Sequence, residues 1–282
     1  MTATIQLPAL VDVNELLAEA EEDYDWLVPG LLERGDRVIV TGGEGKGKST
    51  LLRQWALQCS LGIHPFGGEG FTPARSLLID LENSRKQVRR KLKDIGSDLP
   101  PEGMFQIATW NGLDLSHPDY RAALNAVIMK VHPDLLIIGP MYKMYPNLAT
   151  EEASDALASY LDLIRLAINC TIIMESHQPH QIVMQSQKFR PERPFGSSLW
   201  LRWPEFGFCL EDDGTLRPWR GARDEREFPE KLIRGDEWPW ELAGEGCAIC
   251  NRRLAGKQGK YCSETCSATG RKRRQRARER LL

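Results

Sequence analysis

The sequence lacks the features of a membrane protein or an exported protein. None of its hydrophobic stretches approaches the about 20 residues that a membrane-spanning helix needs. Its N-terminus has no basic segment followed by an apolar one, which is the pattern of a secretory leader. We therefore expect a cytoplasmic protein with no membrane partner.

Basic residues are absent from the first 25 positions, although the net charge of the 282-residue chain is only −2. This segment instead carries seven acidic residues, namely Asp12, Glu15, Glu19, Glu21, Glu22, Asp23 and Asp25. The C-terminus has the opposite imbalance, because residues 271–282 contain seven Lys and Arg residues and one acidic residue, Glu279. Such asymmetry indicates a polyanionic partner at one end of the chain.

The most informative motif matches the P-loop pattern G-x-x-x-x-G-K-[ST] in full. Its residues are Gly42, Gly43, Glu44, Gly45, Lys46, Gly47, Lys48 and Ser49. The apolar run 37–40 before it predicts a strand, and the residues after it, from Thr50 to position 58, predict a helix. In this context the glycine backbone surrounds phosphates, Lys48 reaches the β- and γ-phosphates, and Ser49 holds a magnesium ion. We therefore predict binding of a nucleoside triphosphate rather than a glycine-rich surface turn.

Strand and helix patterns alternate after this motif. The predicted strands are 76–81, 105–110, 134–139 and 170–174, and the predicted helices are 84–95, 119–131 and 150–169. Unbroken apolar strands between helices are typical of an α/β fold with a mainly parallel sheet covered on both faces. A hydrophobic content of 41% is enough for one large core.

The second half of the chain has weaker patterns. Residues 180–194 are polar and predict a mobile loop. Short strands are predicted at 198–201, 207–210 and 216–219, with a hairpin turn at 212–214. Residues 229–246 are rich in Pro, Trp and charge, and predict a linker.

The seven cysteines fall into two groups. Three are scattered in apolar surroundings and are interpreted as core residues: Cys59, Cys170 and Cys209. The other four, Cys247, Cys250, Cys262 and Cys266, form a C-x2-C and a C-x3-C pair around a short basic insert. Two close pairs can place four thiolates around a tetrahedral zinc ion, and a cytoplasmic chain disfavours disulfides. The spacing favours a zinc module over four unpaired thiols.

The order of these segments resembles the hexameric RecA-like ATPases, most closely the RepA-type replicative helicase group with its plasmid, phage and actinobacterial relatives. Four stretches carry the resemblance: 26–32, leading to the P-loop strand, 78–84, 134–140 and 174–177. The resemblance covers roughly residues 24–228. It implies a RecA-like fold, ATP hydrolysis and a homo-oligomer, such as a hexameric ring, that acts on single-stranded DNA.

The resemblance also assigns roles to residues. Glu82 is expected to activate the attacking water, although it is also suited to be a simple carboxylate in the first turn of a helix. His177 is expected to sense the γ-phosphate, unless it is an ordinary polar residue at a strand end. Arg220 and Arg223 stand where the family places arginines that reach a neighbour's nucleotide, and the alternative is a solvated hairpin end.

One position departs from this family. Where the family has an aspartate associated with magnesium, this chain has Gly139, which puts rapid hydrolysis in doubt. Asp80 lies two residues before Glu82, so that strand alternation predicts both side chains on one face. Asp80 is therefore a candidate for the magnesium contact, or an ordinary strand-end residue.

Three basic segments agree with a DNA partner. They are the predicted helix at 85–93, the polar loop with Gln181, Gln185, Gln187, Lys188 and Arg190, and the tail at 271–280. Runs of this kind bind phosphates without reading base sequence. The resulting hypothesis is an ATP-dependent motor or loader on DNA. The alternative, motivated by Gly139, is a nucleotide-gated DNA-binding or regulatory protein with little turnover, and no lid or acceptor-site pattern supports a metabolic kinase.

These patterns together predict the domain organisation of the chain. We expect an acidic arm at 1–23, a RecA-like ATPase domain at 24–228, a linker at 229–246, a zinc-binding module at 247–266 and a basic tail at 267–282.

Overall fold

The computed structural model describes most of the chain before residue 243. The described residues are 10–19, 24–67, 70–96, 98–179, 182–184, 187–189, 193–221, 226, 228–235, 237–243, 261 and 263–268. Among these residues, no helix is both long enough and apolar enough to span a bilayer.

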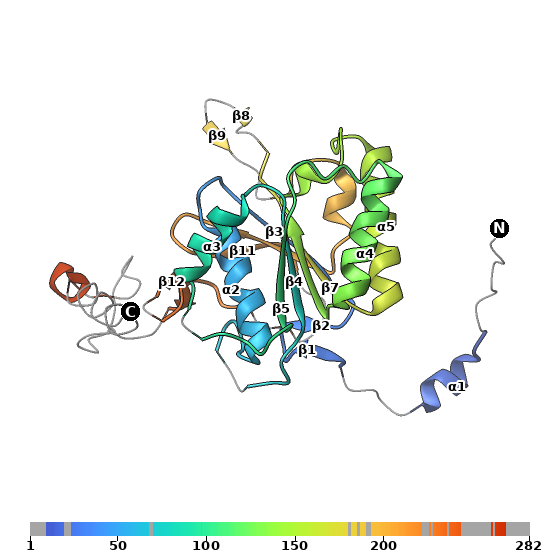
Figure 1. Ribbon diagram of the computed structural model, residues 1–282, viewed down its shortest axis with the longest axis horizontal. Helices are drawn as coiled ribbons and strands as arrows, with labels where there is room; N and C mark the ends of the chain where they lie inside the picture. Colours follow the sequence, from blue (N-terminus) through green and yellow to red (C-terminus); the bar gives the residue numbers. More distant parts are fainter. Residues whose placement is uncertain are drawn as a thin grey trace.

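A seven-stranded sheet forms the centre of the molecule, as shown in Figure 1. Its order is β11-β10-β3-β7-β6-β4-β5. The strands are β3 (Arg37–Gly42), β4 (Ser76–Asp80), β5 (Phe105–Thr109), β6 (Leu135–Gly139), β7 (Thr171–Glu175), β10 (Phe206–Leu210) and β11 (Leu216–Arg220). All neighbours pair in parallel except β10 and β11, which form an antiparallel hairpin. The predicted mainly parallel α/β sheet is thus confirmed.

Helices cover both faces of this sheet (Figure 1). They are α2 (Lys48–Leu61) and α3 (Arg85–Lys93) on one side, and α4 (Pro118–Val131) and α5 (Glu151–Ile168) on the other. The local sequence explains several of the ends: Ser84 and Gln87 form a capping box on α3, and Thr150 caps α5. A short 3-10 helix, η1 (Met141–Lys143), follows β6.

Alternation along each strand divides the core in two. Ile79, Ile138 and Met174 belong to the cluster beneath α4 and α5, whereas Val40 and Ile137 belong to the cluster beneath α2. Because both faces are buried, the strands read as continuous apolar runs rather than as alternating ones. Because these strands pair in parallel, their carboxyl ends lie at one edge of the sheet.

Three segments differ from the sequence predictions. Residues 198–201 form a 3-10 helix, η2 (Ser198–Leu201), rather than a strand, because the Ser197 hydroxyl caps the Leu199 N–H. The segment predicted as a mobile loop contains a hairpin, β8 (Ile182–Met184) with β9 (Gln187–Phe189). The segment predicted as a linker contains another antiparallel pair, β12 (Leu232–Arg234) and β13 (Trp240–Leu242).

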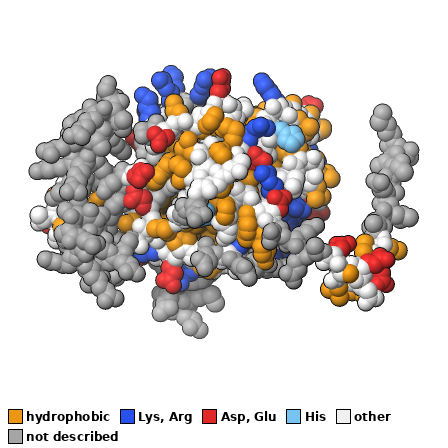
Figure 2. All heavy atoms as spheres, turned by 90° about the horizontal axis from the view of Figure 1, so that it is seen from below, with side chains coloured by type: hydrophobic (Ala, Val, Ile, Leu, Met, Phe, Trp, Pro, Cys, Tyr) orange, Lys and Arg blue, Asp and Glu red, His pale blue; other side chains and the backbone are white. Residues whose placement is uncertain are grey.

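The N-terminal elements precede this sheet. They are α1 (Val13–Ala18), β1 (Trp26–Val28) and β2 (Leu32–Glu33). Within α1, Leu16 and Leu17 are exposed, and Figure 2 shows α1 at the right as a separate group of apolar and acidic side chains.

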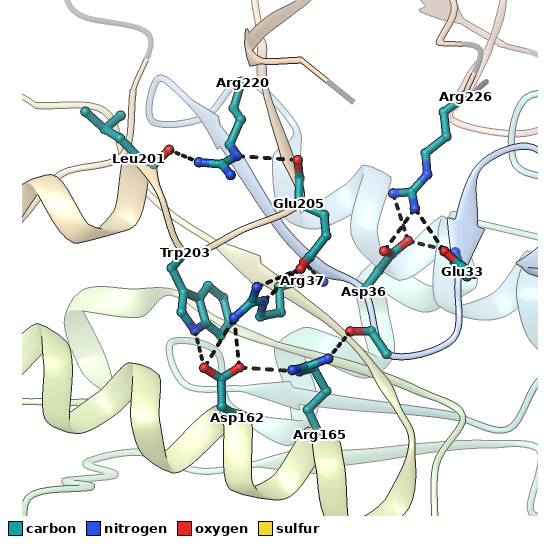
Figure 3. Close-up of polar contacts among 11 residues, drawn as sticks. Glu33, Asp36, Arg37, Asp162, Arg165, Leu201, Trp203, Glu205, Arg220 and Arg226 are labelled. Carbon is teal, nitrogen blue, oxygen red and sulfur yellow. Dashed lines mark hydrogen bonds and ion pairs between the residues drawn. The ribbon is translucent and has the colours of Figure 1, made fainter. Parts of the chain in front are cut away.

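A network of ion pairs ties the amino-terminal edge of the sheet together (Figure 3). Arg37 on β3 pairs with Glu205 at 2.7 Å and with Asp162 on α5 at 3.1 Å. Beside it, buried Asp36 pairs with Arg226 at 2.9 Å. These contacts lie at the opposite edge from the P-loop and hold the two ends of the domain together.

Candidate functional site

The P-loop connects β3 to α2, as the motif predicts. Gly42 has φ +151°, and a Cβ there would lie 2.7 Å from the Leu210 carbonyl oxygen, so the position requires glycine. Gly47, with φ +99°, is the N-cap of α2 and carries no side chain to cap it. The loop thus leaves its backbone N–H groups and the start of α2 for an anion.

Side chains of the motif differ in exposure. Lys48 is buried, and its Nζ donates hydrogen bonds to the Gly42 and Gly43 carbonyl oxygens at 2.9 Å. Lys46 forms an ion pair with Asp212. Glu44 is exposed, and Thr50 lies half-buried in the first turn of α2. Lys48 is therefore the cation held inside the loop, where bound phosphates need it.

Ser49 contacts a carboxylate that sequence reasoning did not single out. Its hydroxyl donates to Glu175 Oε1 at 2.8 Å, and Lys48 Nζ lies 3.9 Å from the same oxygen. Glu175 ends β7, the strand beside the P-loop strand. Burial raises the pKa of Glu175, whereas the charge of Lys48 and the Ser49 hydrogen bond oppose that shift. The available signal was its position at the end of a predicted strand, two residues before the predicted sensor His177.

Asp80 is held inside the protein by other groups. Its Oδ2 accepts from Arg53 on α2 at 2.6 Å, and its Oδ1 accepts from the backbone N–H groups of Glu82 and Asn83. Burial alone would raise its pKa, but the hydrogen bonds from Arg53 and Asn83 outweigh burial and lower it. The expectation that Asp80 and Glu82 share a strand face is wrong, because β4 ends at Asp80 and the chain bends there.

Glu82 belongs to a small polar group at the carboxyl edge of the sheet. It is exposed, and Tyr142 on η1 donates a hydrogen bond to its Oε1 at 3.2 Å. The ring of Tyr142 lies 5.4 Å from the ring of His177. Burial raises the pKa of Tyr142, and the charge of Glu82 adds to this shift, so the hydroxyl stays a donor. The structure thus brings Glu82 and His177, which are both predicted to be catalytic, to either side of Tyr142. The sequence analysis did not identify Tyr142 as part of this group.

These carboxylates and Ser49 line one narrow cleft between α2 and the sheet. Its lining includes Asp80, Glu82, Gly139 and Glu175. Magnesium in P-loop sites takes few protein ligands and keeps waters and phosphate oxygens around it. A serine hydroxyl with carboxylates beside it therefore fits that ion, which would supply positive charge to neutralise the phosphates.

The strands β12 and β13 cover the outer side of the P-loop. Gln54 on α2 exchanges two hydrogen bonds with the backbone of Trp240, at 2.7 and 2.9 Å, and the Trp240 indole donates to the Gly47 carbonyl at 3.3 Å. The Arg234 guanidinium stacks on Trp240 at 3.7 Å. The segment predicted as a linker is thus packed onto the nucleotide site.

The remaining predicted residues lie elsewhere. Arg220 ends β11 at the opposite edge from the P-loop and donates to the carbonyl oxygens of Leu201 and Glu205 (Figure 3). Arg223 lies outside the described residues, as do Cys247, Cys250 and Cys262, whereas Cys266 lies within them. Within the described part of the chain, no three His, Cys, Asp or Glu side chains form a metal cluster. The zinc module therefore stays a prediction.

Comparison with known proteins agrees with this geometry. Residues 2–181 match a family described as AAA domain (AAA_25). The chain belongs to this AAA-domain family. The AAA-domain protein is also similar to the zinc import ATP-binding protein ZnuC of Chromohalobacter salexigens, with 29% identity over 168 residues, 56% of this chain and 68% of that protein.

A solved structure shares the fold. The crystal structure of the KaiC-like protein PH0186 from Pyrococcus horikoshii matches with a TM-score of 0.52 and 16% identity, covering 77% of this chain and 94% of that one. The AAA-domain protein therefore has a RecA-like P-loop fold and belongs to a group of nucleotide-binding ATPases.

Proposed function

We propose that the protein is an ATP-hydrolysing motor or loader that acts on DNA. The observation that supports it best is the carboxyl edge of the sheet, where Ser49, Glu82 and Glu175 line one cleft and Lys48 Nζ lies 3.9 Å from Glu175. A phosphate cradle needs only the loop, whereas hydrolysis also needs a carboxylate to direct water. Glu82 is exposed there, with Tyr142 to orient it.

Each residue has a task in this proposal. Lys48 releases the Gly42 and Gly43 carbonyls and binds the phosphates, and Ser49 contributes its hydroxyl to the magnesium site. Glu82 orients the attacking water and accepts its proton. His177 registers the γ-phosphate and passes that state to residues 178–194, which follow it. Arg220 and Arg223 act on the nucleotide of a neighbouring subunit, since Arg220 lies at the edge away from its own P-loop.

The DNA partner is inferred from charge. On α3 only Val88 is buried, so the basic side chains of this helix point to solvent. The hairpin β8–β9 follows His177, the arrangement in which nucleotide state can move a DNA-contacting loop. The tail at 271–280 adds seven basic residues. A ring of identical subunits would bring these segments around a single strand of DNA.

The second candidate is a nucleotide-gated DNA-binding protein with little turnover, and Gly139 favours it. Steady-state hydrolysis with and without single-stranded DNA separates the two. A motor shows DNA-stimulated phosphate release that Lys48→Ala abolishes. ATP binding without release, at any DNA concentration, supports the gated protein instead.

A further inference from the structure

The end of β6 has no room for a side chain. A Cβ on Gly139 would lie 2.6 Å from the Cβ of Glu175, and 3.1 and 3.2 Å from the backbone nitrogen and Cα of Glu175. The φ of Gly139 is not in the left-handed region, so the backbone there suits any residue. Space next to β7, rather than backbone conformation, therefore requires glycine at this position.

The side chain that fills this space reaches the P-loop. Glu175 accepts the Ser49 hydroxyl hydrogen bond at 2.8 Å and lies 3.9 Å from Lys48 Nζ. It is only 9% exposed, in the cleft that Gly139 and Ser49 also line. A carboxylate beside a P-loop hydroxyl supplies the protein oxygen ligands that magnesium takes in such a site, where waters and phosphate oxygens complete its coordination.

The other two carboxylates of the cleft are engaged elsewhere. Both oxygens of Asp80 accept hydrogen bonds, from Arg53 and Asn83 among others. Glu82 is exposed and bonded to Tyr142. Among the described side chains of this cleft, Glu175 is the carboxylate that contacts Ser49.

We propose that Glu175 on β7 is the magnesium-associated carboxylate of this site. Glycine stands at position 139 on β6 because Glu175 occupies the space that a side chain there would need. P-loop ATPases hold magnesium with the loop Ser or Thr and a carboxylate at a neighbouring strand end. Here the carboxylate lies on β7, one strand nearer to the P-loop than β6. Glycine at position 139 on β6 avoids a side chain that would collide with Glu175. The inference rests on the proposed ATP site. It explains how hydrolysis can persist without an acidic residue at 139.

The test measures nucleotide affinity as magnesium is titrated, with a fluorescent non-hydrolysable ATP analogue. Glu175→Gln retains the shape and the Ser49 hydrogen bond but removes the charge. We expect the magnesium concentration for half-maximal binding to rise about 10-fold or more. Affinity without magnesium should be unchanged or higher, because a negative charge near the phosphates is gone. Glu152→Gln, an exposed carboxylate on α5, is the matched control.

A pair of variants tests whether Glu175 takes the place of an aspartate at position 139. Gly139→Asp should lower the melting temperature because its Cβ collides with Glu175. Adding Glu175→Gly, which removes that Cβ, should recover part of that loss and restore magnesium dependence through the new aspartate. A double variant that is no more stable than Gly139→Asp alone overturns the inference that Glu175 takes the place of an aspartate at position 139.

Two outcomes separate this inference from the proposed function. If Glu175→Gln has the parent's magnesium midpoint while Lys48→Ala weakens analogue binding about 100-fold, the ATP site stands and the role of Glu175 is overturned. If Lys48→Ala binds the analogue as the parent does, the ATP site fails and the inference fails with it.

Discussion

Three carboxylates stand near the carboxyl edge of the sheet, and each has different surroundings. Glu175 is buried against Ser49, Asp80 is paired with Arg53, and Glu82 is exposed beside Tyr142. A buried charge needs a fixed partner, whereas a carboxylate that handles water needs access to it. In our proposals these environments suit Glu175 to metal association, Asp80 to loop support and Glu82 to water activation.

Tyr142 should act through Glu82. Tyr142→Phe removes a hydrogen bond to the Glu82 carboxylate, about 1.5 kcal/mol, so we expect kcat to fall about 10-fold. ATP affinity should change little, since the Tyr142 hydroxyl donates to Glu82 and not to a phosphate-binding residue of the P-loop. Tyr145→Phe, on the same segment, is the control, and equal kcat values for the two variants would contradict a positioning role for Tyr142.

Asp36 should make stability depend on pH. Burial raises its pKa to about 6 from 3.8, although the charge of Arg226 acts against this. Protonated Asp36 is favoured in the fold, so its contribution is fully present below pH 3.8 and is lost as pH rises through about 6. The loss is about 3 kcal/mol.

Urea unfolding of the parent and Asp36→Asn across this pH range measures the effect. The parent should lose stability relative to Asp36→Asn as the pH rises. A difference between the two that is constant from pH 4 to pH 7 contradicts the raised pKa.

At the scale of elements, β12 and β13 extend the ATPase domain. Trp240 is 3% exposed, lies against α2 and donates to Gly47 in the P-loop. This contact connects the nucleotide site with the chain that continues toward the cysteines. β13 therefore lies directly against the P-loop.

Trp240→Ala should lower the free energy of unfolding by about 3–5 kcal/mol, because it leaves a cavity against α2. ATP affinity should also fall, since the P-loop loses the Gly47 contact. Denaturant unfolding and ATP titration measure both effects. Leu242→Ala on the same strand is the control, because Leu242 is 42% exposed; matching results for the two variants would show that β13 does not support the loop.

The elements that the sequence predicts well are those with strong local signals. The P-loop strand and helix, the capping of α3 by Ser84 and the apolar runs of β4, β6 and β7 need no distant partner. Residues 229–246 have the sequence pattern of a linker, because Leu232 and Trp240 are buried by packing against elements far away in the sequence, such as α2. Glu175 was missed for the same reason, since its partner Ser49 lies 126 residues away.

The whole molecule combines a rigid sheet with charged segments at both ends of the chain. Four cysteines lie between β13 and the basic tail. In our account they hold zinc, which supplies folding energy to a segment too short for its own core.

Metal analysis of the purified chain should find about one zinc ion per chain, since four thiolates complete one tetrahedral site. Cys262→Ser should release the metal and leave ATP binding intact, because the P-loop belongs to the sheet. A protein that is purified without zinc, and that gains none on zinc addition, contradicts this module.

The central claim is that this P-loop binds ATP with magnesium, and calorimetric titration of the full chain tests it most directly. We predict one ATP per chain for the parent, and the same affinity for Glu82→Gln, because a water-activating carboxylate contributes mainly to the chemical step. Lys48→Ala should bind about 100-fold more weakly, because charged hydrogen bonds to the phosphates are lost. Parent-like affinity in Lys48→Ala would contradict the account, because ATP would then be bound somewhere other than the P-loop.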